Sequence, residues 1–459
     1  MSKKSSAGLI PVTEGSLVKN IILFAIPVSL TGLLQLIFSS VDNVVIGRYC
    51  GADALASMGT VIPLVILIVD MLMGLSTGAA VCSAQAIGSK QRRDVHEVVH
   101  TALLSALIGG AVLGVIGIIF AEPILRLMAV EDKLMAGASV YLRIYLIGLP
   151  FMLFFNFGSA ILRSAGDTKH PLCFLFIGGG VNLVLNLIFV IAFNWGIPGV
   201  AVATAMSQLL SASLVALHLM RCDADYKFDP RALKIYKKKF IRIIAIGIPA
   251  GVQSMVFSLS NVIIQASVNS LGASVVAGTT AAGNLEGYAN TAMSGFYQSA
   301  ITFAAQNMGA KKIKRMNRSV TLSAVFAAIV GIMINGICMI FANEMLGIFI
   351  VDDVAAIEAG YIRIFVLAPF HFLCGIMQVY MSATQAMGAT VPPVIISIIG
   401  SCGIRITWIL TVFRIMHSTE VLFWCYPISW VLTLTAMLVQ YFILKPRLLR
   451  ANGLIQTDN

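Results

Sequence analysis

The chain has 459 residues, of which 58% are hydrophobic and only 11% charged, and its mean hydropathy is +0.92. Soluble domains carry about 25% charged and about 45–50% apolar residues, so this composition excludes an ordinary soluble protein and predicts that lipid covers much of the surface. The formal net charge of +11 is of the size seen in nucleic-acid-binding proteins. The basic residues, however, lie in short loops between apolar runs rather than on one face, so we expect no nucleic-acid partner.

Apolar runs follow one another along the whole chain. About 20 such residues cross the hydrocarbon core as a helix, and on that basis the sequence predicts an all-α integral membrane protein with twelve transmembrane helices. The expected spans cover residues 20–45, 54–82, 96–120, 137–162, 171–193, 197–219, 240–268, 275–304, 319–342, 357–383, 393–413 and 421–444.

The basic residues are distributed unevenly between alternate loops. If the N-terminus is cytoplasmic, 24 of the 31 Lys and Arg residues fall in cytoplasmic tails and loops. This excess supports the helix count and predicts that both the N- and the C-terminus are cytoplasmic. The first 20 residues are polar, so we expect no cleavable signal peptide and insertion through the first span.

The two halves of the chain repeat one another at nearly constant offsets. Ile26-Pro27 matches Ile248-Pro249 at an offset of 222 residues. Further matched pairs are Gly51-Ala52 with Gly272-Ala273, Gln85-Ala86-Ile87-Gly88 with Gln306-Asn307-Met308-Gly309, Tyr141-Leu142-Arg143-Ile144 with Tyr361-Ile362-Arg363-Ile364, and Gly166 with Gly388.

Each half holds six predicted spans, so both halves enter the membrane from the same side. They are then related by an axis along the membrane normal. The sequence therefore predicts two pseudo-twofold-related six-helix bundles: an N-lobe over residues 1–220, a basic cytoplasmic linker over 221–239 and a C-lobe over 240–459.

A duplicated bundle is typical of secondary transporters, in which two similar halves move about a shared cavity. An enzyme or an ATP-driven pump would need a nucleophile motif, metal-ligand spacing or a Walker A loop, and we find none of these patterns in the sequence. The eight cysteines have neither metal-type nor disulfide-type spacing. We expect a transporter rather than an enzyme, without a cofactor or a resident metal.

Several short motifs occur in order along both halves: Thr13-Glu14-Gly15-Ser16, Ile26-Pro27, Val41-Asp42, Gly51-Ala52-Asp53-Ala54-Leu55-Ala56, Gln85 to Gly88, Gly199-Val200-Ala201-Val202-Ala203-Thr204 with Ser207-Gln208, and Gln306-Asn307-Met308-Gly309-Ala310. Together they resemble the multidrug and toxic compound extrusion (MATE) family, closest to the prokaryotic DinF-like type. The resemblance implies export of small cationic or amphipathic organic compounds in exchange for H⁺ or Na⁺ by alternating access. It also implies a monomer in the bacterial inner membrane, with small-molecule substrates and the lipid bilayer as its partners.

Asp42 lies in the outer half of the first predicted span. A carboxylate at a helix centre costs about 2.5–3.5 kcal/mol to insert, so it needs a partner or a function. Either its charge is hydrated in the outer headgroup zone, or, as the resemblance implies, it exchanges H⁺ or Na⁺ together with Asn182, Asn186 and Thr204. Asn186 replaces an acid that is common in the family, which leaves one negative charge and several oxygen ligands and favours neither ion. Pro27 is a candidate hinge that lets the first span bend when Asp42 changes state.

Four other polar residues lie within predicted spans. Glu286 and Arg405 have similar depths and predict a charge pair, which either clips the C-lobe together or takes part in substrate or ion binding. Gln253 stands in the region where sodium-type members carry a Glu, so that site is not carried over, and we expect Gln253 at the substrate cavity. Asp70 either lines the cavity or accepts a hydrogen bond from a neighbouring hydroxyl.

A lipid-linked precursor flippase of the same superfamily is the alternative function. Such flippases often have fourteen spans or several basic residues in the cavity. Here the sequence predicts twelve spans, and Arg405 is the only basic residue clearly in mid-span. These features favour the efflux transporter.

Overall fold

The computed structural model describes residues 9–350 and 353–454, which are almost entirely helical and contain no strand. Ten continuous helical segments are long and apolar enough to cross a membrane, and α4 with α5, bent by 45°, makes an eleventh. Helix α9 is not among these eleven because its sequence is more polar, but at 37 residues it is as long as the spanning helices. The predicted all-α membrane fold with twelve spanning helices is confirmed.

The helices belong to two compact units. Within the described residues, the first unit comprises 9–10 and 30–248, and the second comprises 11–29, 249–350 and 353–454. The first helices in chain order are α1 (Leu17–Tyr49), α2 (Ala52–Ser89), α3 (Arg92–Leu127), α4 (Asp132–Ile147), α5 (Leu149–Ser164), α6 (Lys169–Leu187), η1 (Ile188–Ala192), α7 (Ile197–Arg221) and η2 (Pro230–Ala232).

The remaining helices begin with α8, which contributes to both units. They are α8 (Lys237–Asn269), α9 (Ala273–Gly309), α10 (Ile313–Ile340), α11 (Ala342–Gly347), α12 (Val354–Leu367), η3 (Ala368–Phe370), α13 (His371–Ala386), α14 (Val391–Ser397), η4 (Ile398–Gly403), α15 (Ile404–Trp408), η5 (Ile409–Phe413), α16 (Arg414–Met416) and α17 (Thr419–Ala451).

The chain crosses between the units first between Ile10 and Pro11, ahead of α1, and then twice more inside helices. The boundary in α1 follows residue 29, two positions beyond Pro27, and the boundary in α8 immediately precedes Pro249. The basic segment 221–239, expected as a linker, packs with the first unit. There the backbone N–H of Asp229 donates to His100 Nε2 at 3.0 Å, close to where the chain leaves α7.

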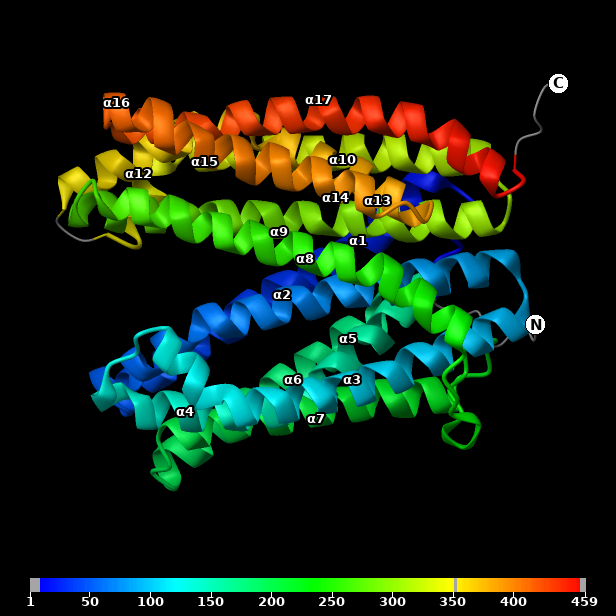
Figure 1. The fold of residues 1–459 in the computed structure, drawn as a ribbon, viewed down its shortest axis with the longest axis horizontal. Coiled ribbons are helices and arrows are strands. Elements are labelled where there is room, and N and C mark those ends of the chain that lie inside the picture. The colour runs from blue at the N-terminus through cyan, green and yellow to red at the C-terminus, as the bar shows by residue number, and fades with distance from the viewer. Residues whose placement is uncertain (1–8, 351–352, 455–459) are drawn as a thin grey trace. The chain divides into compact units, whose positions relative to one another are not determined.

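Close helix packing in the first unit occurs at Gly178 on α6. A Cβ atom there would overlap the hydroxyl of Ser211 on α7, so a larger residue would force that side chain to move. Asn182 and Asn186 follow Gly178 at intervals of four and therefore share its face. Figure 1 shows α5, α6 and α7 alongside one another in this unit.

A comparable approach joins α9 and α12 in the second unit. A Cβ atom on Gly278 would overlap the carbonyl oxygen of Ala356, a backbone atom that cannot rotate away. Thr279 and Glu286 are seven residues, or two helical turns, apart on α9 and share a face. The contact at Gly278 brings that face against α12, which carries Arg363.

Candidate functional site

Four polar side chains form a hydrogen-bonded chain inside the first unit. Asn186 Nδ2 donates to Asp42 Oδ1 at 2.6 Å and to Asn182 Oδ1 at 3.1 Å, and Asn182 Nδ2 donates to Thr204 Oγ1 at 3.4 Å. Thr204 in turn donates to the carbonyl oxygen of Val200 at 3.0 Å. The structure thus brings together, from α1, α6 and α7, all four residues proposed for cation coupling, although their role stays a prediction.

This chain of contacts is largely shielded from solvent. Asn186 is 0% exposed and Asn182 6% exposed, while Asp42 and Thr204 are half-buried. Among the described residues Asn186 Oδ1 has no hydrogen-bond partner although it is buried, and such a group is costly unless something compensates it. The carboxylate of Asp42, this free amide oxygen and the Thr204 hydroxyl are the kinds of oxygen ligand that hard cations take. The cluster therefore offers a carboxylate that can take up a proton and oxygen atoms of the kind that bind a small cation.

Segments of π-helix lie beside two of the candidate residues. Asn186 is followed closely by η1, and Arg405 lies on the short helix α15 between η4 and η5. The starts of η1 at Ile188 and η5 at Ile409 are 221 residues apart, which matches the sequence repeat. Because π-helical turns inside α-helices often occur at functional sites, both positions are candidates for binding or conformational change.

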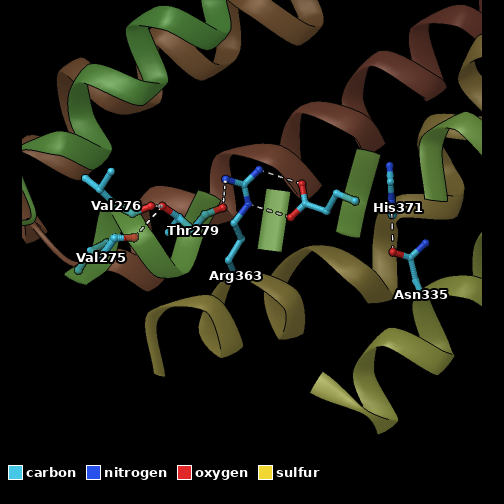
Figure 2. A network of polar contacts seen from close by, with 7 residues as sticks. Val275, Val276, Thr279, Asn335, Arg363 and His371 are labelled. Atoms are coloured by element: carbon cyan, nitrogen blue, oxygen red, sulfur yellow. Dashed lines mark hydrogen bonds and ion pairs between the residues drawn. The ribbon is translucent and has the colours of Figure 1, made fainter. Parts of the chain in front are cut away.

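The partly buried carboxylate of Glu286 pairs with Arg363 on α12. Arg363 Nε donates to Glu286 Oε1 at 2.8 Å, and Nη2 donates to Oε2 at 2.9 Å (Figure 2). Arg363 Nη1 also donates to the carbonyl oxygen of Thr279 at 3.1 Å. The predicted partner, Arg405, was wrong, because α12 packs along α9 whereas Arg405 faces α17. Arg363 belongs to one of the repeated motifs, which was the available sequence signal.

The Glu286–Arg363 pair has the geometry of a fixed structural contact. Both carboxylate oxygens are engaged by one guanidinium, an arrangement that is stronger and more directional than a single contact. The side chains are only 14% exposed for Arg363 and 19% for Glu286, and the guanidinium lies 5.1 Å from the Phe423 ring centroid. Of the two alternatives for Glu286, this geometry favours a clip that joins α9 to α12.

Arg405 is 1% exposed and lies among aromatic rings. Its Nε donates to Ser429 Oγ at 2.9 Å, and its guanidinium carbon lies 4.2 Å from the Tyr426 ring centroid and 5.4 Å from that of Phe257. Nη1 and Nη2 have no hydrogen-bond partner in the described part of the chain. Since a guanidinium keeps its charge in proteins, the second unit contains a buried positive charge that aromatic contacts compensate only in part.

Three other predicted residues are placed as follows. Gln253 Nε2 donates to Ser397 Oγ and contacts Met381 Sδ, each at 3.0 Å, and so ties α8 to α14 and α13. Asp70 is half-buried on α2. Pro27 lies inside the continuous helix α1. The cavity-lining roles of Gln253 and Asp70 and the hinge role of Pro27 stay predictions.

Comparisons with known proteins agree on one family. The model of the family described as MatE matches residues 27–188 and 235–411. The "Probable multidrug resistance protein YoeA" of Bacillus subtilis (strain 168) is 26% identical over 418 residues, covering 89% of each chain. The "FAD transporter" of Shewanella oneidensis is 25% identical, covering 83% of this chain and 84% of its own.

A solved structure extends the similarity to the fold. It is described as "Outward-facing conformation of a multidrug resistance MATE family transporter of the MOP superfamily". The match has a TM-score of 0.88 at 19% identity and covers 98% of this chain and all of the other, 100%.

Proposed function

The chain belongs to the MatE family of membrane transporters, not enzymes, and we propose that it exports small cationic or amphipathic organic compounds in exchange for H⁺ or Na⁺ by alternating access. The observation that carries the coupling proposal is the contact of the Asp42 carboxylate with the fully buried amide of Asn186 at 2.6 Å. We expect a monomer with both termini in the cytoplasm of a bacterial cell.

The contact between Asp42 and Asn186 supports coupling because its strength depends on the charge of Asp42. An ionised carboxylate attracts the amide donor strongly, and a protonated or sodium-bound one attracts it less. Loading therefore changes how firmly α1 is held to α6 within the first unit. A cation can drive transport only if it binds two conformations with different affinities. A conformation that keeps the contact between Asp42 and Asn186 and one that loses it would differ in this way.

Reconstituted transport tests the proposal directly. Purified protein in liposomes is given an H⁺ gradient or a Na⁺ gradient separately, and uptake of a fluorescent cationic dye is followed. We expect one gradient to drive transport, and D42N to lower the driven rate by about tenfold or more because the coupling charge is lost. E131Q is the matched control, since it removes a carboxylate in the same unit whose side chain is 66% exposed. Gradient-driven transport that persists unchanged in D42N contradicts the coupling role.

Arg405 supports a second candidate cargo, a nucleotide-like anion. Its guanidinium has two nitrogens without partners and a charge that no ion pair among the described residues neutralises, and one relative is described as an FAD transporter. Transport of FAD and of a cationic dye is measured in the same liposomes. Transport of FAD alone favours the anionic cargo, and transport of the dye alone favours the cationic one. The lipid-linked precursor flippase is a further alternative, and rescue of a cell-wall precursor defect by the wild-type chain would favour it over both.

A further inference from the structure

Three metal-ligating side chains lie together at one end of the first unit. Asp167 is in the turn between α5 and α6, His170 is in the first turn of α6, and His218 is in the last turn of α7. Asp167 Oδ2 is 2.6 Å from His170 Nδ1 and 3.6 Å from His218 Nε2. All three ligand atoms lie within 4.8 Å of one another. Two imidazoles therefore share one carboxylate oxygen.

The backbone and the packing hold these side chains in place. Asp167 Oδ1 accepts a hydrogen bond from the backbone N–H of His170 at 3.1 Å, which fixes the carboxylate and leaves Oδ2 toward the imidazoles. The Asp167 side chain is only 6% exposed, whereas that of His170 is 50% exposed and that of His218 is 24% exposed. The cluster combines a buried, oriented carboxylate with two imidazoles that water can reach.

We propose that Asp167, His170 and His218 form a binding site for a divalent transition-metal ion such as Zn²⁺. Two imidazole nitrogens and one carboxylate oxygen are a common zinc donor set, with water in the fourth position. Bond lengths near 2.0–2.1 Å and tetrahedral geometry put ligand atoms about 3.3 Å apart. The two distances from Asp167 Oδ2 bracket that value. For a metal to bind His170 Nδ1, the neutral imidazole carries its one proton on Nε2 instead, which leaves Nδ1 and Asp167 Oδ2 free to act as ligands.

The other half of the chain forms the same turn without these ligands. Gly166 and Gly388, related by the 222-residue repeat, have φ angles of 89° and 90°. The same offset relates the first residues of α7 and α17. It places Ala389, Pro392 and Gln440 at the positions of the three ligands, and none of them offers a carboxylate or an imidazole. The turn therefore forms without the Asp-His-His set, which points to a separate role for it.

A bound metal would tie the start of α6 to the end of α7. These are the helices whose Asn182 and Thr204 side chains meet in the candidate coupling site. Metal binding should therefore stabilise the α6–α7 pair, and this effect is independent of which cargo or ion the transporter uses.

Zinc binding by the full chain tests the site. Detergent-solubilised protein without an affinity tag is equilibrated with Zn²⁺ alone, and bound metal is measured by elemental analysis with melting temperature in parallel. We expect one Zn²⁺ per chain and a zinc-dependent rise in melting temperature. H218Q and H170Q should each weaken binding by at least about tenfold. H417Q is the matched control, since His417 is exposed and distant in sequence from all three ligands.

Two results overturn the proposal. One is wild-type protein that binds no stoichiometric zinc, which would make the cluster a hydrogen-bonded contact only. The other is zinc binding that is equally strong in H170Q and H218Q. Because the His170 side chain is half-exposed, we expect H170Q to fold, so its zinc binding can be measured even if H218Q fails to fold. Melting of each variant without zinc verifies its fold.

Discussion

Removing Arg363 should destabilise the protein far more than removing an exposed arginine. In R363M the Glu286 carboxylate, whose side chain is 19% exposed, loses both of its hydrogen bonds to the guanidinium. Breaking a buried ion pair from one side costs about 3–5 kcal/mol. Since about 1 kcal/mol moves the melting temperature of a domain of 150–250 residues by roughly 2–4 °C, we expect a fall of roughly 10 °C in detergent.

The double variant E286M/R363M shows whether the pair is a clip or a working site. Replacing both charges with apolar side chains of similar volume is often neutral, so we expect the double variant to melt near the wild type. R126M is the matched control, because Arg126 pairs with Glu122 on the surface and should give no measurable shift. A fall in melting temperature for R363M that is no larger than for R126M would refute the reasoning. A stable double variant that no longer transports would assign the pair to binding instead.

Three further predictions use the same purified protein. G278A should lower the melting temperature, because its methyl group would overlap the carbonyl oxygen of Ala356 and overpacking costs about 1–3 kcal/mol. R405M should melt at or above the wild-type temperature, because it removes a buried charge without leaving an unpaired charge behind; a fall in melting temperature as large as in R363M contradicts this. N186D should shift coupling toward H⁺, because two adjacent carboxylates tend to share a proton; separate H⁺ and Na⁺ gradients measure the change.

Hydropathy was enough to predict the helices but not their neighbours. Each span depends on the composition of its own 20 or so residues, so the helix count follows from local sequence. The depth of Glu286 in the membrane could be inferred in the same way. Its partner could not, because depth does not tell which helix lies alongside, and the contact with Arg363 depends on the packing of α9 against α12.

The two polar clusters of the first unit differ in how they could be found. Asp42, Asn182, Asn186 and Thr204 were selected through the family resemblance, and the structure joins them by hydrogen bonds. The spacing of Asp167, His170 and His218 along the sequence does not match a metal-binding motif. The third ligand, on α7, follows the turn by a whole helix hairpin, and spacing rules detect only ligands that one short segment supplies.

Two of the boundaries between the units lie next to the repeated prolines. Hydropathy places domain boundaries in polar loops, yet the chain changes units inside α1 and α8, within two residues of Pro27 and Pro249. A proline inside a helix removes one backbone hydrogen bond and crowds the preceding turn, which makes that point the easiest to bend. We therefore predict that a change of conformation bends α1 and α8 at these prolines while each unit keeps its internal packing.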